Sequence, residues 1–182
     1  TDPEMVRLIQ LTEDSGATPI QAPETAMTRN QAIPFSTGPV ASARPFHPVT
    51  VDQRAALTAL RCLTQAVYFE AALEPDAGQA AVAQVVLNRV RDPNYADTVC
   101  GVVFEGAERT TGCQFSFTCD GALSQAPVPW AWERARKAAE KALNGYVAQT
   151  VGTATHYHAD YVDPWWAPTV SRVNNIGTHV FY

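Results

Sequence analysis

The sequence contains no long apolar run and no cluster of basic residues. Nothing in it approaches the roughly 20 apolar residues that a membrane-spanning helix needs. Its formal net charge is −5, and its 13 Lys and Arg residues are scattered rather than grouped. Nucleic acids and acidic membranes are bound through clustered Lys and Arg, so both are disfavoured as partners. At 182 residues the chain has room for one domain with an appended arm.

The sequence also lacks the usual signatures of a metal site. Its four cysteines, Cys62, Cys100, Cys113 and Cys119, form no CxxC pair, and there is no HExxH motif, so we expect no metal and no other cofactor. An even number of spread cysteines is typical of two disulfides and of an oxidising compartment. Three pairings are possible. We favour Cys113–Cys119, which closes a short loop, and Cys62–Cys100, with four free thiols in a cytosolic protein as the alternative.

Residues 1–48 differ in composition from the rest of the chain. Apart from a helix-compatible start at Glu4 to Leu11, they are rich in Pro, Thr, Ala and Ser and show no sustained periodicity. This composition is typical of a linker or an extended arm. We therefore expect an arm over residues 1–48 and one folded domain over residues 49–182. A homo-oligomer or a partner contact through the arm stays open.

Hydrophobic periodicity predicts two helices at the start of the domain. Thr50-Val51-Asp52-Gln53 has the capping-box pattern, and the helix after it should run to about Leu73, since Pro75 disfavours helical backbone before it. Asp76 is the expected cap of a second helix that reaches about Val90. This second helix is apolar on nearly all sides, so it should be the central buried helix.

The later elements are expected to be shorter and to end in strands. In order, they are a short helix at about 98–104, a small hairpin over 114–118, a helix from about 130 to 143 and strand-like runs at 153–159 and 176–182. Asn144-Gly145 is a common C-terminal cap for the helix before it. Helices first and a small antiparallel sheet last make an α+β domain.

Glu70 is the residue that most directly suggests chemistry. It shares one helical face with apolar neighbours, namely Leu60, Leu63, Ala66, Val67 and Ala71. A carboxylate that faces a core is costly while ionised, so the pKa of Glu70 should rise. A carboxyl with a raised pKa can donate a proton near neutral pH, as the acid of a glycosidase must. The alternative is a buried carboxylate paired with Arg89 of the second helix.

Two further polar groups are candidates for the same site. Glu74 follows Glu70 by one helical turn, so two carboxylates can face one cleft, although Glu74 suits a helix-end role equally well. His156, His158 and Asp160 would point to one face of a strand, where they can hold a divalent metal or line a substrate. Late aromatic residues either stack on sugar rings or form the core of the sheet; they are Tyr157, Tyr161, Trp165, Trp166 and Phe181.

The order of several segments after residue 60 resembles the SleB/CwlJ-type cell-wall hydrolase family. The matching segments are Ala66-Val67-Tyr68-Phe69-Glu70-Ala71, Glu74-Pro75, Gly78-Gln79-Ala80-Ala81-Val82-Ala83, Val86-Leu87-Asn88-Arg89-Val90, Cys100-Gly101-Val102-Val103, Gln114-Phe115-Ser116 and Ile176-Gly177-Thr178-His179-Val180-Phe181. Residues 1–48 take no part. The four cysteines and Ala71-Ala72-Leu73 are closer to the Gram-negative members than to those that act on spore cortex.

The resemblance implies an enzyme with a lysozyme-like helical core that cuts peptidoglycan glycan strands. Its catalytic glutamate corresponds to Glu70. As a lytic transglycosylase, it would protonate the oxygen between N-acetylmuramic acid and N-acetylglucosamine. It would then take the proton of the muramyl C6 hydroxyl, which closes a 1,6-anhydro ring. Attack by water instead would make it a muramidase.

The resemblance also directs attention to the residues that would hold the glycan strand. The candidates are Glu74, Gln114, Phe115, Ser116, Tyr157, His158 and Trp166. A secreted or periplasmic location is expected. Two alternatives stay open, a metal-dependent wall amidase or peptidase that uses His156, His158 and Asp160, and a non-catalytic peptidoglycan-binding module.

Overall fold

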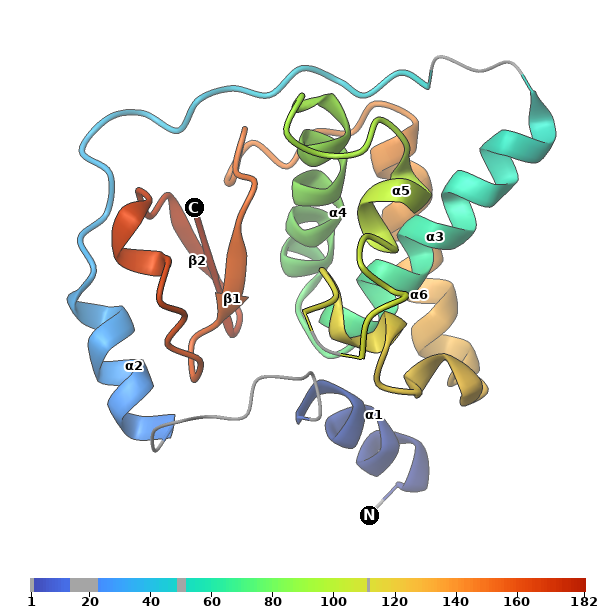
Figure 1. Ribbon diagram of the computed structural model, residues 1–182, viewed down its shortest axis with the longest axis horizontal. Helices are drawn as coiled ribbons and strands as arrows, with labels where there is room; N and C mark the ends of the chain where they lie inside the picture. Colours follow the sequence, from blue (N-terminus) through green and yellow to red (C-terminus); the bar gives the residue numbers. More distant parts are fainter. Residues whose placement is uncertain (1, 14–22, 49–51, 111) are drawn as a thin grey trace.

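The computed structural model describes residues 2–13, 23–48, 52–110 and 112–182, and its architecture is α+β, as predicted (Figure 1). The elements, with η for 3₁₀ turns, are α1 (Pro3–Glu13), α2 (Pro23–Ala32), α3 (Gln53–Ala71), α4 (Asp76–Arg91), α5 (Val99–Val103), η1 (Ser116–Thr118), η2 (Ala122–Ser124), α6 (Pro129–Leu143), β1 (Tyr157–Ala159), η3 (Ala167–Thr169), β2 (Asn174–Ile176) and β3 (His179–Phe181). Helices α3 to α6 gather on one side, and the sheet and α2 lie on the other. None of the described helices is long and apolar enough to cross a bilayer.

The ends of α3 and α4 are capped differently from the expectation. Thr50, the expected cap of the first helix, lies outside the described residues, and the side chain of Asp52 instead accepts a hydrogen bond from the Arg54 amide at 3.0 Å. The prediction that Asp76 caps the next helix is wrong, because Pro75 occupies the cap position. Asp76 is the first helical residue, and its carboxylate bonds to Arg134 at 2.9 Å. The side chain of Asp76 therefore ties α4 to α6.

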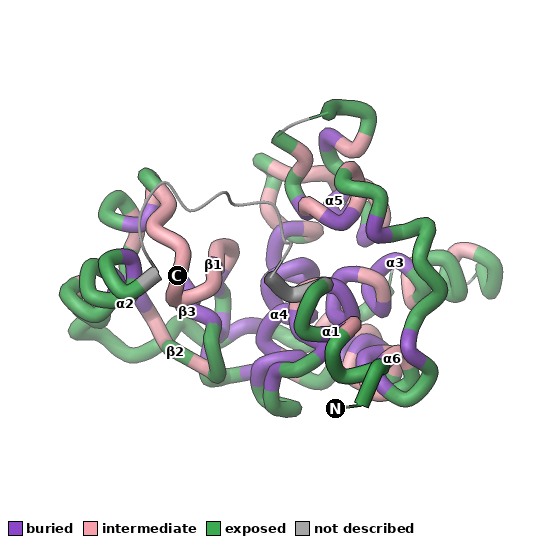
Figure 2. The backbone as a smooth tube through the Cα atoms, turned by 90° about the horizontal axis from the view of Figure 1, so that it is seen from below, coloured by how far each residue is buried: buried purple, intermediate pink, exposed green. Residues whose placement is uncertain are grey.

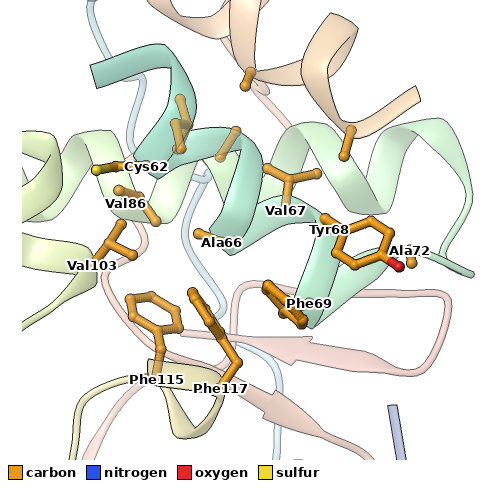
Figure 3. Packing of buried hydrophobic residues seen from close by; sticks show 14 of the residues in the cluster. Cys62, Ala66, Val67, Tyr68, Phe69, Ala72, Val86, Val103, Phe115 and Phe117 are labelled. Atoms are coloured by element: carbon orange, nitrogen blue, oxygen red, sulfur yellow. The ribbon is translucent and has the colours of Figure 1, made fainter. Parts of the chain in front are cut away.

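The central helix of the domain is α4, as its apolar composition predicted. Its apolar side chains are almost entirely hidden from solvent, and they include Val82, Val85, Val86 and Leu87. Burying one such side chain contributes roughly 1.5–3 kcal/mol. Figure 3 shows the adjoining cluster, in which Phe69 of α3 stacks on Phe117 with ring centroids 4.6 Å apart. This cluster fixes the end of α3, where Glu70 follows Phe69.

Both disulfides that the sequence favoured are present in the structure. Cys62 of α3 is bonded to Cys100 of α5, with Cα atoms 5.3 Å apart. Cys113 is bonded to Cys119 around the turn η1, with Cα atoms 6.5 Å apart. The chain has no free cysteine. The second disulfide holds a loop that the site uses.

The predicted hairpin over residues 114–118 is wrong. Ser116–Thr118 is a 3₁₀ turn, in which the Thr118 amide bonds to the Phe115 carbonyl at 3.1 Å and the Cys119 amide to the Ser116 carbonyl at 3.0 Å. Phe115 and Phe117 are both buried in the core, so the alternation of apolar residues reflects a turn with two anchors rather than a strand.

The sheet is antiparallel with the strand order β1-β3-β2. Of the predicted run at 153–159, only Tyr157–Ala159 is strand, and Tyr157 pairs with Phe181 of β3. The predicted run at 176–182 is divided by a tight turn at Gly177, where φ is +58°, so Ile176 ends β2 and His179 begins β3. The sheet is small, and its C-terminal position agrees with the sequence.

The N-terminal residues lie on the domain. The expected helix near the start is α1, whose Leu8 is fully buried in the main core. No helix was predicted where α2 lies, because its buried residues, Ala26 and Asn30, give no apolar stripe. After α2 the chain crosses, as far as residue 48, from the sheet side towards the helical side (Figures 1 and 2), and the Ala41 carbonyl accepts a hydrogen bond from the Thr153 amide at 3.1 Å on the way. The boundary at residue 48 and an oligomer through the arm both stay predictions.

Candidate active site

A cleft of about 560 Å³ lies between the helical side and the sheet. One wall comes from the ends of α3 and α4 and from the loop before η1, and the other comes from β1, the β2–β3 turn and the loop after β1. All of the predicted site residues line it, namely Glu70, Glu74, Gln114, Phe115, Ser116, Tyr157, His158 and Trp166. Segments nearly ninety positions apart in the sequence thus meet in one cleft.

Glu70 is the half-buried carboxyl of this cleft. The Tyr157 hydroxyl donates a hydrogen bond to its Oε2 at 2.9 Å. Burial raises the pKa of Glu70 to about 7, while the bond from Tyr157 and the charge of Arg89 lower it, and the charge of Asp120 adds a smaller rise. Near neutral pH, a substantial fraction of Glu70 is therefore protonated and able to donate its proton.

Arg89 lies near Glu70 but is not its ion-pair partner. Among the described residues, no ion pair within 4.0 Å joins the two side chains. The Nε of Arg89 donates to the Thr155 carbonyl at 2.8 Å, and its guanidinium lies 5.3 Å from the Tyr95 ring centroid and 5.6 Å from that of Phe115. The alternative of a simple buried Glu–Arg pair is thus wrong. Arg89 instead lowers the pKa of Glu70 through the electrostatic field of its positive charge.

Glu74 faces the same cleft, but its carboxylate is already engaged. Its Oε2 accepts from the Thr178 amide at 3.0 Å, and its Oε1 accepts from the Thr178 hydroxyl. Its backbone carbonyl accepts from Arg134 at 2.6 Å. Glu74 is 8% exposed, so this carboxylate fastens the β2–β3 turn to the start of α4. Glu74 is therefore not free to act as a second catalytic carboxylate.

The histidines of the cleft are held by neighbouring groups. Both ring nitrogens of His158 have partners at 2.8 Å, the Ala159 carbonyl at Nδ1 and the Tyr182 hydroxyl at Nε2. Because a carbonyl only accepts, Nδ1 carries the proton and Tyr182 donates to Nε2. Burial lowers the pKa of His158 and of His156, so both are neutral near pH 7.

The alternative metal site is not assembled by this arrangement. Within the part of the chain that the structure describes, no three His, Cys, Asp or Glu side chains gather as ligands of one ion. His156, His158 and Asp160 alternate in the sequence, but only His158 belongs to β1. Divalent metals in proteins need several converging ligands, so the geometry gives this alternative no support.

Several residues of the cleft were not predicted as site residues. They are Arg89, Tyr95, Thr178 and His179, whereas His156, Tyr161 and Trp165, which the sequence had offered as metal, substrate or stacking candidates, also line the cleft. Trp165 is 86% exposed, an unusual environment for an indole ring and one that suits a stacking platform. His179 is buried behind Tyr157, with ring centroids 5.1 Å apart. Its place in the motif Gly177-Thr178-His179 was the signal that could have identified it.

Residues 73–182 match the family model of the cell wall hydrolases. A spore cortex-lytic enzyme of Halalkalibacterium halodurans is 37% identical over 123 residues, which are 67% of this chain and 34% of that protein. A spore cortex-lytic enzyme of Oceanobacillus iheyensis is 34% identical over 134 residues, 73% of this chain and 44% of that protein. The chain thus spans less than half the length of these relatives.

Two solved structures have a similar fold. The catalytic domain of the germination-specific lytic transglycosylase SleB from Bacillus anthracis is 33% identical, with a TM-score of 0.58 over 74% of this chain and 98% of that domain. The catalytic domain of the Bacillus cereus SleB protein is 31% identical, with a TM-score of 0.58 over 80% of this chain and 98% of that domain. The similarity therefore extends over nearly the whole of both catalytic domains.

Proposed function

Because the chain belongs to the cell wall hydrolase family, we propose that it cleaves peptidoglycan glycan strands as a lytic transglycosylase, with Glu70 as general acid and base. The observation that carries the proposal is the carboxyl of Glu70, which lines the cleft, is bonded to Tyr157 and has a pKa of about 7. Glu70 precedes the family match at residue 73, so its role is argued from its geometry.

The proposed reaction has two proton transfers at one carboxyl. Protonated Glu70 donates to the oxygen that links N-acetylmuramic acid to N-acetylglucosamine, and the bond from the muramyl C1 to that oxygen breaks. The carboxylate so formed is stabilised by the Tyr157 hydroxyl and by the charge of Arg89. It then takes the proton of the muramyl C6 hydroxyl, whose oxygen bonds to C1. The products are a 1,6-anhydromuramyl end and a free N-acetylglucosamine hydroxyl.

The state of Glu74 favours this route over hydrolysis. Hydrolysing glycosidases generally use two carboxyl groups, one as acid and one as base or nucleophile. Of the described residues that line the cleft, the carboxylates are Glu70 and Glu74, and Glu74 is bonded to Thr178. A mechanism in which one carboxyl serves twice fits this arrangement.

The proposed glycan contacts lie on both sides of Glu70. Gln114 and Ser116 offer polar groups from the helical side, and Tyr157 lies on the sheet side beside His158, whose ring nitrogens are already bonded. Sugar rings would stack on Trp165, and Phe115 and Trp166 also line the cleft. We place the enzyme in a secreted or periplasmic location, because peptidoglycan lies outside the cytoplasm and disulfides persist in oxidising compartments.

The test is a digest of purified peptidoglycan, with the products identified by mass spectrometry. Wild type should release anhydromuramyl ends, and Glu70→Gln should lose activity by roughly 10²- to 10⁴-fold because an amide cannot donate the proton. Glu24→Gln, at an exposed glutamate of α2, is the matched control and should keep wild-type activity. Reducing muramyl ends would change the reaction to hydrolysis. Equal release by wild type and Glu70→Gln would refute the role of Glu70.

A further inference from the structure

Asn30 of α2 is a buried amide with two donors in use. It is 2% exposed, and its Nδ2 donates to the carbonyl of Asp160 at 2.5 Å and to that of Val162 at 2.7 Å. The side-chain amide has two N–H groups, so both are satisfied by this one segment. A buried carbonyl that loses its donor costs free energy, so these bonds fix the position of the segment relative to α2.

Neighbouring contacts also tie α2 to the C-terminal part of the chain. The backbone carbonyl of Asn30 accepts from Arg172, which is 5% exposed and whose guanidinium lies 3.8 Å from the Phe35 ring centroid. Arg29 forms an ion pair with Asp163 at 2.8 Å. Figures 1 and 2 show α2 beside the sheet side of the molecule, away from helix α3, which carries Glu70.

The segment that Asn30 holds is part of the cleft. Tyr161 and Val162 line it, and Trp165 and Trp166 follow a few residues later. Residues 160–166 leave the sheet after β1 and have no strand pairing of their own. Contacts from outside the segment must therefore supply much of its rigidity, and α2 supplies the two bonds of Asn30 and the ion pair of Arg29.

We propose that Asn30 is a positioning residue that holds the aromatic wall of the cleft, over residues 161–166, in the arrangement that binds the glycan strand. It acts on affinity rather than on bond cleavage, because its contacts reach the sheet wall and not Glu70. Asn30 lies outside the family match over residues 73–182, so this support comes from the chain's own N-terminal arm. The inference rests on the proposed function, since it assigns a glycan to the same cleft.

The experiment separates binding from cleavage by using two backgrounds. Affinity for soluble, peptide-free glycan strands is measured by tryptophan fluorescence in Glu70→Gln protein, with and without Asn30→Leu. Leucine has a similar volume but no donors. The dissociation constant should rise roughly tenfold with Asn30→Leu, the equivalent of losing one good contact. With Glu70 intact, the rate at saturating glycan and its pH dependence should stay unchanged.

The matched control is Gln31→Leu, which makes the same kind of change at the exposed residue next to Asn30. It should bind glycan like the unsubstituted protein. All affinities are measured well below the thermal midpoint of each variant, so that loss of stability alone does not change them. An Asn30→Leu protein with unchanged affinity would overturn the inference. So would one whose rate falls while its affinity is kept.

If Asn30→Leu does not fold, Arg29→Ala takes its place. This substitution removes the ion pair to Asp163, which is more exposed than the hydrogen bonds of Asn30 and so costs less stability. A smaller loss of affinity in the same direction supports the inference, and unchanged affinity overturns it. The two proposals fail differently. Protein with intact Glu70 that binds glycan without cutting it refutes the proposed activity and leaves the affinity comparison valid. Protein that binds no glycan overturns both.

Discussion

At the scale of single residues, the chemistry depends on how strongly each neighbour favours one charge state of Glu70. Burial favours the protonated form and is the largest influence, whereas Tyr157 and Arg89 favour the carboxylate. The result is a pKa of about 7. This value lies between the higher pKa that suits a group acting only as an acid and the lower pKa that suits a group acting only as a base. A group that must first give a proton and then take one benefits from this intermediate value.

Replacement of Tyr157 by Phe should shift the pH dependence of activity upward. The hydroxyl of Tyr157 donates to the carboxylate and so lowers the pKa of Glu70, and its loss lets the proton stay bound to higher pH. Activity needs protonated Glu70, so the alkaline limb of kcat/KM should move to higher pH. Its position is measured on soluble glycan from pH 5 to 9.

Tyr146→Phe is the control, because Tyr146 is an exposed tyrosine that does not line the cleft. It should leave the pH profile in place. An alkaline limb that stays fixed, or moves to lower pH, in Tyr157→Phe would show that this bond does not favour the ionised form of Glu70.

The residue scale also shows what sequence reasoning can reach. Glu70 was predictable because its helix and its apolar neighbours are local in sequence, so one periodicity places the carboxyl and implies its raised pKa. Glu74 and Asn30 were not predictable in their roles. The partner of Glu74 is Thr178, 104 positions away, and the partners of Asn30 are 130 and 132 positions away. No local pattern encodes such contacts.

At the scale of elements, the β2–β3 turn is the most constrained piece of the cleft. Gly177 has φ of +58°, and a Cβ at this position would lie 1.7 Å from Oε2 of Glu74. The turn and the carboxylate therefore fit together only when residue 177 has no side chain. Thr178 and His179, which follow the turn, line the cleft.

Gly177→Ala should destabilise the protein and reduce its activity. The new methyl group must displace the carboxylate of Glu74, which breaks the bonds to Thr178 and moves the wall next to it. Together with the strained backbone, the expected cost is roughly 1–3 kcal/mol of unfolding free energy. Urea unfolding monitored by circular dichroism gives this number, and a glycan digest gives the activity.

Gly38→Ala is the matched control for this substitution. A Cβ at Gly38 meets no atom within 4 Å, and its φ is outside the left-handed region, so the change should be nearly neutral. Equal stability of the two variants would show that the close packing of Gly177 on Glu74 contributes little.

The elements also divide into those that a pattern can reveal and those that it cannot. Helices α3, α4, α5 and α6 were predicted to within a few residues, because periodic apolar residues and caps mark them. The 3₁₀ turn η1 was mistaken for a hairpin, since two buried phenylalanines spaced by one residue look like a strand. Helix α2 was missed because its main buried contact is the polar side chain of Asn30.

At the scale of the whole molecule, the raised pKa of Glu70 implies a cost in stability. Its ordinary pKa is 4.5, and the folded value is about 7. Below pH 4.5 the carboxyl is protonated in both the folded and the unfolded state. As the pH rises from 4.5 through 7, the unfolded state ionises first, so the folded state progressively loses stability.

Glu70→Gln should therefore be more stable than wild type at pH 8 and about equally stable at pH 4. The amide fills the same space and never pays for a buried charge. The measurement is the free energy of urea unfolding at intervals of pH, with Glu24→Gln as the exposed control. A stability difference between Glu70→Gln and wild type that is the same at every pH would contradict the folded pKa of about 7.

The cleft is built from two parts of the chain that leave the ribosome at different times. Glu70 emerges first, whereas Tyr157, its hydrogen-bond partner, follows 87 residues later, and the turn at Gly177 comes later still. A nascent chain that has made α3 and α4 thus holds its acid beside a single wall. The second wall of the cleft forms only when the last strands dock, so the order of translation places the assembly of the site after the synthesis of both β1 and β3.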